Sequence, residues 1–255
     1  MSVVAIIPAR FGSSRFPGKP LAKIGTKPMI QHVYESAVRA ELDRVLVATD
    51  DRRIVRAVHA FGGEALLTSK KHTSGTDRLA EVAQGLRARW IINVQGDLPF
   101  IHADTIRRSL EPLMRDPGIP MGTAATPIVV KHEFVNRNVV KVVTDSQGFA
   151  AYFSRAPIPY HREDGPRTAP RGSFQWGKRH LGIYVFRRKF LLEFARLTPA
   201  PLEVVEGLEQ LRALHHGFRI SVADVEEPSV EVDTPGDLAV AEKYWTRLQT
   251  KDQHG

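Results

Sequence analysis

The sequence predicts an α/β protein that is built around a doubly wound, mostly parallel sheet. Val3–Ile7 is a short, uninterrupted apolar run, which is typical of a strand covered on both faces in a parallel sheet. Strand-like and helix-like segments then alternate as far as Leu67, the pattern of parallel strands joined by crossover helices. Because a chain of 255 residues can bury one substantial core, we expect a single domain over residues 1–255.

The elements up to residue 67 are predicted from their periodicity and their end residues. Lys27–Ala40 is expected to be a helix, since Pro28 suits a first turn and apolar residues recur on one face. A second helix is expected from Asp50 to about Phe61, where Gly62 and Gly63 close it. The strands between these helices are Arg44–Ala48 and Glu64–Leu67.

A polar loop, residues 71–78, follows and enters a helix over Leu79–Leu86. Thr76 or Asp77 can cap this helix by accepting backbone N–H groups. The remaining predicted strands are Trp90–Val94, Met121–Pro127, Arg179–Phe186 and Phe218–Val225. The remaining predicted helices are at about 103–115, at Pro201–His216 and from Pro235 to about Gln249. Thr234 is expected to cap the last helix, and residues 250–255 after it are expected to be a disordered tail.

The middle of the chain is expected to differ from the parallel part. Val139–Val143 and Phe149–Ser154 alternate around the turn residues 145–148, which predicts a β-hairpin. Pro157–Lys178 is rich in proline, glycine and charge and has no regular period, so it is expected to be a mobile surface loop, either a lid or an ordinary connection.

The loop after the first strand contains the first functional signal. Ligands of open α/β sheets bind past the carboxyl ends of the strands, where glycines allow close approach and cations neutralise phosphates. Five residues separate Gly12 from Gly18, and Pro20 follows Lys19, so this is not a Walker A loop, and there is no G-x-G-x-x-G dinucleotide motif. The loop predicts a triphosphate site, with a solvated basic loop as the alternative; its cations are Arg10, Arg15 and Lys19.

Asp97 and Glu209 are the next candidate functional residues. Asp97 follows the strand Trp90–Val94, so we expect it in the same crevice as the basic loop, although it could simply cap a turn. Glu209 falls on the apolar stripe of the expected helix Pro201–His216, where a carboxylate needs a partner. That partner is either an internal arginine or a substrate hydroxyl.

Composition narrows the class of protein. The 255 residues contain no cysteine, which excludes disulfides and thiolate zinc sites and fits a reducing cytoplasm. No apolar stretch is long enough to cross a membrane, and the N-terminus lacks a signal-peptide core. The net charge of +8 comes from dispersed cations, which favours small anionic substrates over nucleic acid.

Several motifs, in order, resemble one family. The first is R-x-x-S-x-R-x-P-G-K-P-L at residues 10–21. The others are KPMI (27–30), VATDD (47–51), HTSGTDRLAE (72–81), NVQGD (93–97), YFSRAPIP (152–159), RHLGIY (179–184), LEQLR (208–212) and VDTPGDL (232–238). Together the chain resembles the 3-deoxy-manno-octulosonate (Kdo) cytidylyltransferases, which are sugar nucleotidyltransferases with a Rossmann-like fold of the nucleotide-diphospho-sugar transferase type.

The resemblance implies roles for individual residues. It implies that Asp97 and Asp233 bind Mg²⁺; without the resemblance, Asp233 could be only part of a helix cap. The catalytic group would consist of these two aspartates with Arg10, Arg15 and Lys19. The nucleotide contacts would come from Pro8, Ala9, Arg10, Ser13, Lys19, Ser74, Gly75, Arg78 and Gln95. The sugar contacts would come from Arg155, His180, Tyr184, Glu209 and Gln210. Many relatives have an acidic residue where this chain has Leu98. This difference puts in doubt a second carboxylate at that position, and it leaves the implied role of Asp97 unchanged.

The implied reaction is nucleotidyl transfer. The anomeric hydroxyl of Kdo attacks the α-phosphorus of CTP, and pyrophosphate leaves. The resemblance also implies a homodimer whose interface, with part of the sugar site, lies at about residues 128–190, and a product used for lipopolysaccharide synthesis. The alternatives are a cytidylyltransferase for another acid sugar, such as 8-amino-Kdo or sialic acid, and a non-catalytic nucleotide-binding or RNA-binding module.

Overall fold

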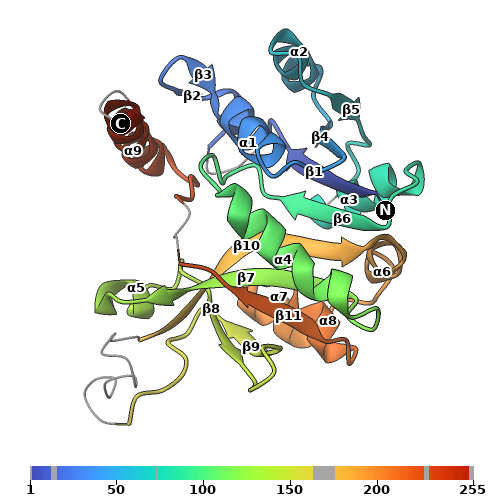
Figure 1. Ribbon diagram of the computed structural model, residues 1–255, viewed down its shortest axis with the longest axis vertical. Helices are drawn as coiled ribbons and strands as arrows, with labels where there is room; N and C mark the ends of the chain where they lie inside the picture. The colour runs from blue at the N-terminus through green and yellow to red at the C-terminus, as the bar shows by residue number, and fades with distance from the viewer. Residues whose placement is uncertain (1, 13–15, 73, 163–175, 227–229, 253–255) are drawn as a thin grey trace. The chain divides into compact units, whose positions relative to one another are not determined.

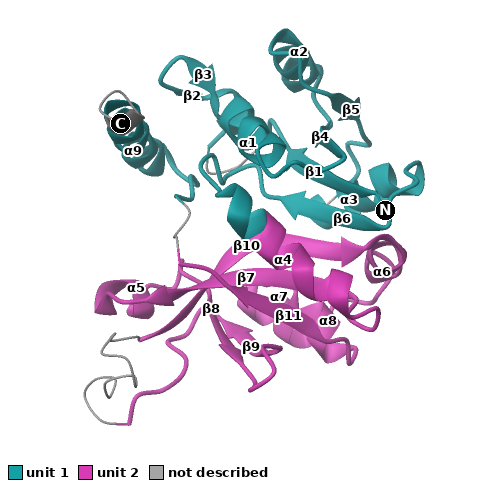
Figure 2. Ribbon diagram, viewed as in Figure 1, with its two compact units in different colours: residues 1–106, 229–255 teal, residues 107–228 magenta. Residues whose placement is uncertain are grey.

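A computed structural model of the chain describes residues 2–12, 16–72, 74–162, 176–226 and 230–252 (Figure 1). It divides into two compact units (Figure 2). Unit 1 comprises residues 1–106 and 229–255, and unit 2 comprises residues 107–228. The expectation of a single domain stays a prediction.

Unit 1 contains a parallel sheet in the order β6-β1-β4-β5. Its strands are β1 (Val3–Ala9), β4 (Arg44–Thr49), β5 (Ala65–Leu67) and β6 (Trp90–Val94). Ala5, Ile6 and Ile7 are fully buried, as the uninterrupted apolar run predicts for a central strand. The strand does not stop at Ile7, because proline tolerates the extended backbone and Pro8 still pairs with Ala48.

The helices of unit 1 alternate with these strands. They are α1 (Met29–Val38), α2 (Arg52–Ala60), α3 (Gly75–Gln84) and α9 (Pro235–Asp252), with the 3₁₀ turn η1 (Lys19–Leu21) and the short strands β2 (Lys23–Ile24) and β3 (Lys27–Pro28). α4 (Ala103–Arg115) begins in unit 1 and continues into unit 2. The expected α/β class with mostly parallel strands is confirmed.

Three helix starts show how local chemistry sets the boundaries. Pro28 precedes α1 as its N-cap with extended backbone (ψ 148°) rather than lying in the first turn. α3 begins at Gly75, earlier than predicted, because Ser74 is its N-cap and exchanges hydrogen bonds with Asp77 in a capping box. Thr234 caps α9 as predicted, with its hydroxyl oxygen 3.3 Å from the Asp237 backbone nitrogen.

Unit 2 is a mixed sheet. β11 (Ile220–Asp224) pairs parallel with β7 (Met121–Ile128), and β10 (Gly177–Arg187) pairs antiparallel with β7. The predicted hairpin is confirmed as β8 (Lys141–Thr144) and β9 (Ala150–Ser154), and β8 also pairs with β10. The helices of this unit are α5 (Lys131–Val135), α6 (Arg188–Phe194), α7 (Pro201–Glu206) and α8 (Leu211–His215).

The single helix predicted over Pro201–His216 is wrong. Gly207 adopts the left-handed conformation (φ 62°) and ends α7, so the chain changes direction before α8. The predicted buried stripe is therefore interrupted. Val205 is 81% exposed, whereas Leu211 is 2% exposed.

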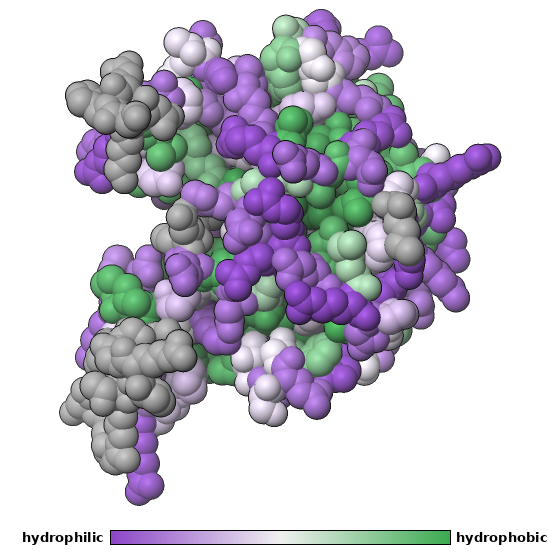
Figure 3. Space-filling model, viewed as in Figure 1, coloured by the Kyte–Doolittle hydropathy of each residue, from purple (hydrophilic) through white to green (hydrophobic). Residues whose placement is uncertain are grey.

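Within the described ranges, every helix is too short or too polar to span a membrane. On the face drawn in Figure 3, hydrophilic side chains lie between the hydrophobic ones. The expected lid at Pro157–Lys178 falls largely on residues 163–175, which lie outside the described residues. The tail predicted over residues 250–255 is wrong in its first part, because α9 continues to Asp252; residues 253–255 lie outside the described residues.

Candidate functional site

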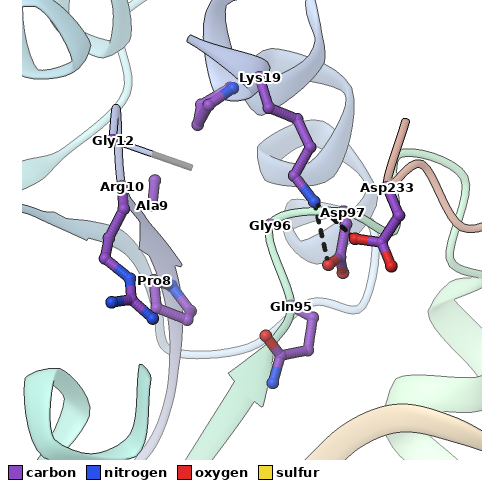
Figure 4. A pocket seen from close by; sticks show the side chains of 10 residues that line it. Pro8, Ala9, Arg10, Gly12, Lys19, Gln95, Gly96, Asp97 and Asp233 are labelled. Carbon is purple, nitrogen blue, oxygen red and sulfur yellow. Dashed lines mark hydrogen bonds and ion pairs between the residues drawn. The ribbon is translucent and has the colours of Figure 1, made fainter. Parts of the chain in front are cut away.

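A cavity of about 310 Å³ lies in unit 1 beyond the carboxyl ends of β1 and β6 (Figure 4). The close approach of the two strand ends requires Gly96, because a Cβ there would lie 2.8 Å from the carbonyl oxygen of Pro8. The cavity is lined by Pro8, Ala9, Arg10, Gly12, Lys19, Pro20, Gln95, Gly96, Asp97 and Asp233. The basic loop and the predicted aspartates therefore share one cavity.

Lys19 joins the two aspartates. Its Nζ lies 3.3 Å from Oδ2 of Asp97 and 3.2 Å from Oδ1 of Asp233 (Figure 4). The two carboxylates are close because Val232, just before Asp233, is fully buried and donates its backbone N–H to the carbonyl oxygen of Asp97 at 2.9 Å. Residues 135 positions apart in the sequence are thus fixed side by side by a backbone hydrogen bond.

The electrostatics of this cluster favour a cation. Desolvation raises the pKa of the Asp97 carboxyl above its ordinary value, and Asp233 raises it further, while the Lys19 ammonium opposes both effects. Glu231 is a third carboxylate: it, Asp97 and Asp233 each place one oxygen within 4.8 Å of the others. Sequence reasoning missed Glu231, although it lies only two residues before Asp233.

The predicted base-binding loop reaches the same strand end. A Cβ on Gly75 would lie 3.6 Å from Cγ of Pro8, so the start of α3 is packed against β1. Ser74 is occupied as the N-cap of α3. Arg78 is fully buried and bonds Asp50 at 2.8 Å as well as Thr68, so its guanidinium connects α3 to two preceding segments rather than lining the cavity.

Arg10 lies across the cavity from Lys19, next to Pro8 (Figure 4). Gln95 lines the same cavity. Ser13 and Arg15 lie outside the described residues, so their predicted roles stay predictions.

In unit 2, three of the predicted sugar-binding residues form one network. The Tyr184 hydroxyl donates to Oε1 of Gln210 at 3.0 Å, and the rings of His180 and Tyr184 lie 5.4 Å apart. Nε2 of His180 lies 3.0 Å from Oγ1 of Thr123, and burial lowers the His180 pKa to about 3, so the ring is neutral. Nε2 of Gln210 is buried without a hydrogen-bond partner among the described residues.

The fourth predicted sugar ligand, Arg155, is held by its surroundings. Its backbone N–H donates to a carboxylate oxygen of Glu206 at 2.9 Å. Its Nε donates to the backbone carbonyl oxygen of Glu206 at 2.7 Å. Its carbonyl oxygen accepts from Nζ of Lys141 at 2.7 Å. Lys141 is fully buried and also donates to the carbonyls of Asn136 and Val139.

Glu209 does not occupy the buried stripe from which its role was argued. Its side chain is 31% exposed, and Oε1 lies 3.7 Å from Nη2 of Arg212. Arg212 instead forms its short contacts with Glu203, at 2.5 and 2.9 Å. Glu209 is thus a secondary partner of this arginine, although its Oε1 atom is itself buried. Its predicted contact with the sugar stays a prediction.

Comparison with known proteins gives matches over nearly the whole chain. A family model described as cytidylyltransferase matches residues 4–220. The 3-deoxy-manno-octulosonate cytidylyltransferase of Trichlorobacter lovleyi is 52% identical over 95% of this chain and 98% of its own length, and that of Geobacter sulfurreducens is 52% identical over 93% and 97%. A solved structure of CMP:2-keto-3-deoxy-manno-octonic acid synthetase complexed with CTP is 41% identical, covers 97% of this chain and 99% of its own, and has a TM-score of 0.88.

Proposed function

The chain belongs to the cytidylyltransferase family, and on that premise we propose that it transfers CMP from CTP to the anomeric hydroxyl of 3-deoxy-manno-octulosonate, releasing pyrophosphate. The observation on which this rests is the single cavity that joins a basic loop to paired carboxylates. The nature of the two substrates is supported by the relatives named for this sugar and by the similar structure complexed with CTP. The proposal includes use of the product for lipopolysaccharide synthesis, which the family resemblance implies.

The reaction needs positioning and charge neutralisation rather than a covalent nucleophile. The hydroxyl oxygen forms a bond to the α-phosphorus, the bond from that phosphorus to the bridging oxygen of the β-phosphate breaks, and the hydroxyl proton is lost. Arg10 and Lys19 line the cavity and would stabilise the negative charge that develops on the departing pyrophosphate. No dedicated general base is assigned.

The cluster also fits a divalent metal ion, which belongs to the proposal. Mg²⁺ prefers carboxylate oxygens and usually shares its sites with substrate phosphates. Asp97 and Asp233 would hold it, with Glu231 as a third carboxylate within 4.8 Å. Burial and the neighbouring Asp233 raise the pKa of Asp97, and an added positive charge would offset both effects, which supports the proposal. When bound, the ion would neutralise the triphosphate and lower the pKa of the attacking hydroxyl.

The sugar acid is assigned to the network in unit 2. The unpartnered Nε2 of Gln210 is a buried donor, which suits a sugar oxygen because a buried polar atom without a partner is costly. The neutral His180 ring adds no charge there. Arg155 would supply the positive charge for the carboxylate of the acid.

A cytoplasmic homodimer completes the proposal. CTP is a cytoplasmic metabolite, so the reaction is placed there. In the region expected to dimerise, Val129, Val130 and Val135 are 48–59% exposed, which is unusual for a group of three valines and suits a protein interface. Light scattering coupled to size exclusion should give twice the 28.5 kDa mass of the chain.

The test is pyrophosphate release with Mg²⁺ across the four nucleoside triphosphates and three sugar acids: Kdo, 8-amino-Kdo and sialic acid. CTP with Kdo should be fastest, because a site built on hydrogen bonds rejects a base that leaves its polar groups unpaired. Equal rates with ATP or GTP would refute the cytidylyl assignment, and a faster rate with another acid would replace Kdo. Binding of RNA with a steep salt dependence and no turnover would favour the non-catalytic alternative.

A further inference from the structure

The ammonium group of Lys19 is saturated by its contacts in unit 1. A lysine has three N–H donors, and Lys19 has three acceptors: Oδ2 of Asp97 at 3.3 Å, Oδ1 of Asp233 at 3.2 Å and the carbonyl oxygen of Val232 at 3.0 Å. Its side chain is only 14% exposed. In this arrangement Lys19 has no donor left for a phosphate oxygen.

The oxygens that hold Lys19 belong to the residues that would hold the metal. Asp97 and Asp233 are two of the three carboxylates that lie within 4.8 Å of one another. A cation bound to them would lie a few ångströms from the ammonium, where like charges repel strongly even at an effective dielectric constant of about 20. Lys19 and a divalent cation are therefore competitors for one place.

We propose that Lys19 is an exchangeable counter-ion: it holds Asp97 and Asp233 together until a divalent cation takes its place, and the displaced ammonium then binds the triphosphate. This inference rests on the proposed function of the site. The exchange is sterically simple, because the ammonium is a compact charge on a flexible four-carbon chain and already lines the cavity shared with Arg10.

The exchange links the two ligands. A metal ion that displaces Lys19 makes its donors available to CTP, and CTP that attracts Lys19 leaves the carboxylates to the metal. By thermodynamic linkage the two effects are equal, so each ligand strengthens the binding of the other by the same factor. A lysine fixed permanently on the phosphates, or one that served only the carboxylates, would add nothing to the coupling that direct contact between the metal ion and the phosphates already provides.

The test measures Mn²⁺ binding to the full chain without nucleotide, from the electron paramagnetic resonance signal of free Mn²⁺. Lys19→Met removes the competitor and should tighten Mn²⁺ binding by at least about tenfold. Lys23→Met is the matched control, since it removes the same charge from an exposed position four residues away and should change the affinity by less than about twofold. Lys19→Arg keeps the charge and should stay near wild type.

Melting curves provide the second measurement. Lys19→Met should lower the melting temperature in EDTA, because two carboxylates then face each other, and Mn²⁺ should raise it more than in wild type. If Lys19→Met does not fold in EDTA, Lys19→Gln replaces it, as an amide keeps hydrogen bonds without the charge. Mn²⁺ affinity in folded Lys19→Met or Lys19→Gln that equals or falls below wild type would overturn the exchange. Absence of CTP turnover in the wild type would overturn the proposed function instead.

Discussion

Glu203→Gln should destabilise the protein far more than Glu209→Gln, although both glutamates face Arg212. Glu203 binds the guanidinium through two oxygens, at 2.5 and 2.9 Å, and the two side chains are 12% and 10% exposed. Breaking a buried ion pair from one side typically costs about 3–5 kcal/mol. Because the amide keeps one acceptor oxygen, we expect a loss of about 3 kcal/mol in the free energy of unfolding.

Glu209→Gln is the matched control. Its Oε1 is buried but lies 3.7 Å from the same guanidinium, beyond hydrogen-bond distance, and the side chain is 31% exposed, so we expect this long contact to be worth only about 0–1 kcal/mol. Urea unfolding at neutral pH, with equal m-values for the three proteins, measures both losses. Equal losses, or a larger one for Glu209→Gln, would refute the assignment of Glu203 as the main partner.

The pH dependence of stability gives an independent check of this pair. Burial alone would raise the pKa of Glu203, but hydrogen bonds from Arg212 and from the Ala200 backbone outweigh it and hold the pKa below 4.5. The contribution of Glu203 is therefore present above pH 4.5 and is lost as the pH falls through the lowered pKa of the folded state. Glu203→Gln should reduce this acid sensitivity.

Three further outcomes follow from the two sites. Asp97→Asn should nearly abolish turnover while the melting temperature stays within a few degrees of wild type; wild-type turnover at low Mg²⁺ would contradict the metal role. Lys141→Met should raise the KM for the sugar acid and spare that for CTP, because Lys141 holds the carbonyl of Arg155 at 2.7 Å; an unchanged sugar KM would contradict this. His180→Asn should flatten the loss of stability between pH about 6.5 and 3, since the buried neutral ring must bind a proton on unfolding; an unchanged slope would place His180 in a more polar environment.

The unit 1 site was largely predictable because it depends on a general property of parallel sheets. Strand ends meet at one edge, so the loop after β1 and the Gln95–Asp97 segment after β6 had to be neighbours. The approach of Asp233 was not predictable from patterns, since it depends on the Val232 N–H that bonds the Asp97 carbonyl. Only the family resemblance brought Asp233 to this place.

The long helix predicted around Glu209 is wrong for a physical reason. The prediction assumed one helical period over Pro201–His216. Gly207 lies inside that range and, because it has no side chain, it readily leaves the helical conformation. A left-handed glycine ends a helix at little cost, whereas the apolar pattern alone cannot show a change of direction. Gly207 was therefore the feature of the sequence that could have predicted the end of this helix.

The geometry of the network around His180 cannot be predicted from the periodicity of a strand. In a regular strand, His180 and Tyr184 would be on one face but about 13 Å apart. In β10 the pairing shifts between Leu181 and Tyr184, so His180 lies opposite Ala125 and Tyr184 opposite Thr123, two positions apart instead of four. This bulge brings the two rings to 5.4 Å and directs Tyr184 to Gln210. A residue pair that depends on a bulge is specified by the partner strand, so its geometry is absent from the local sequence.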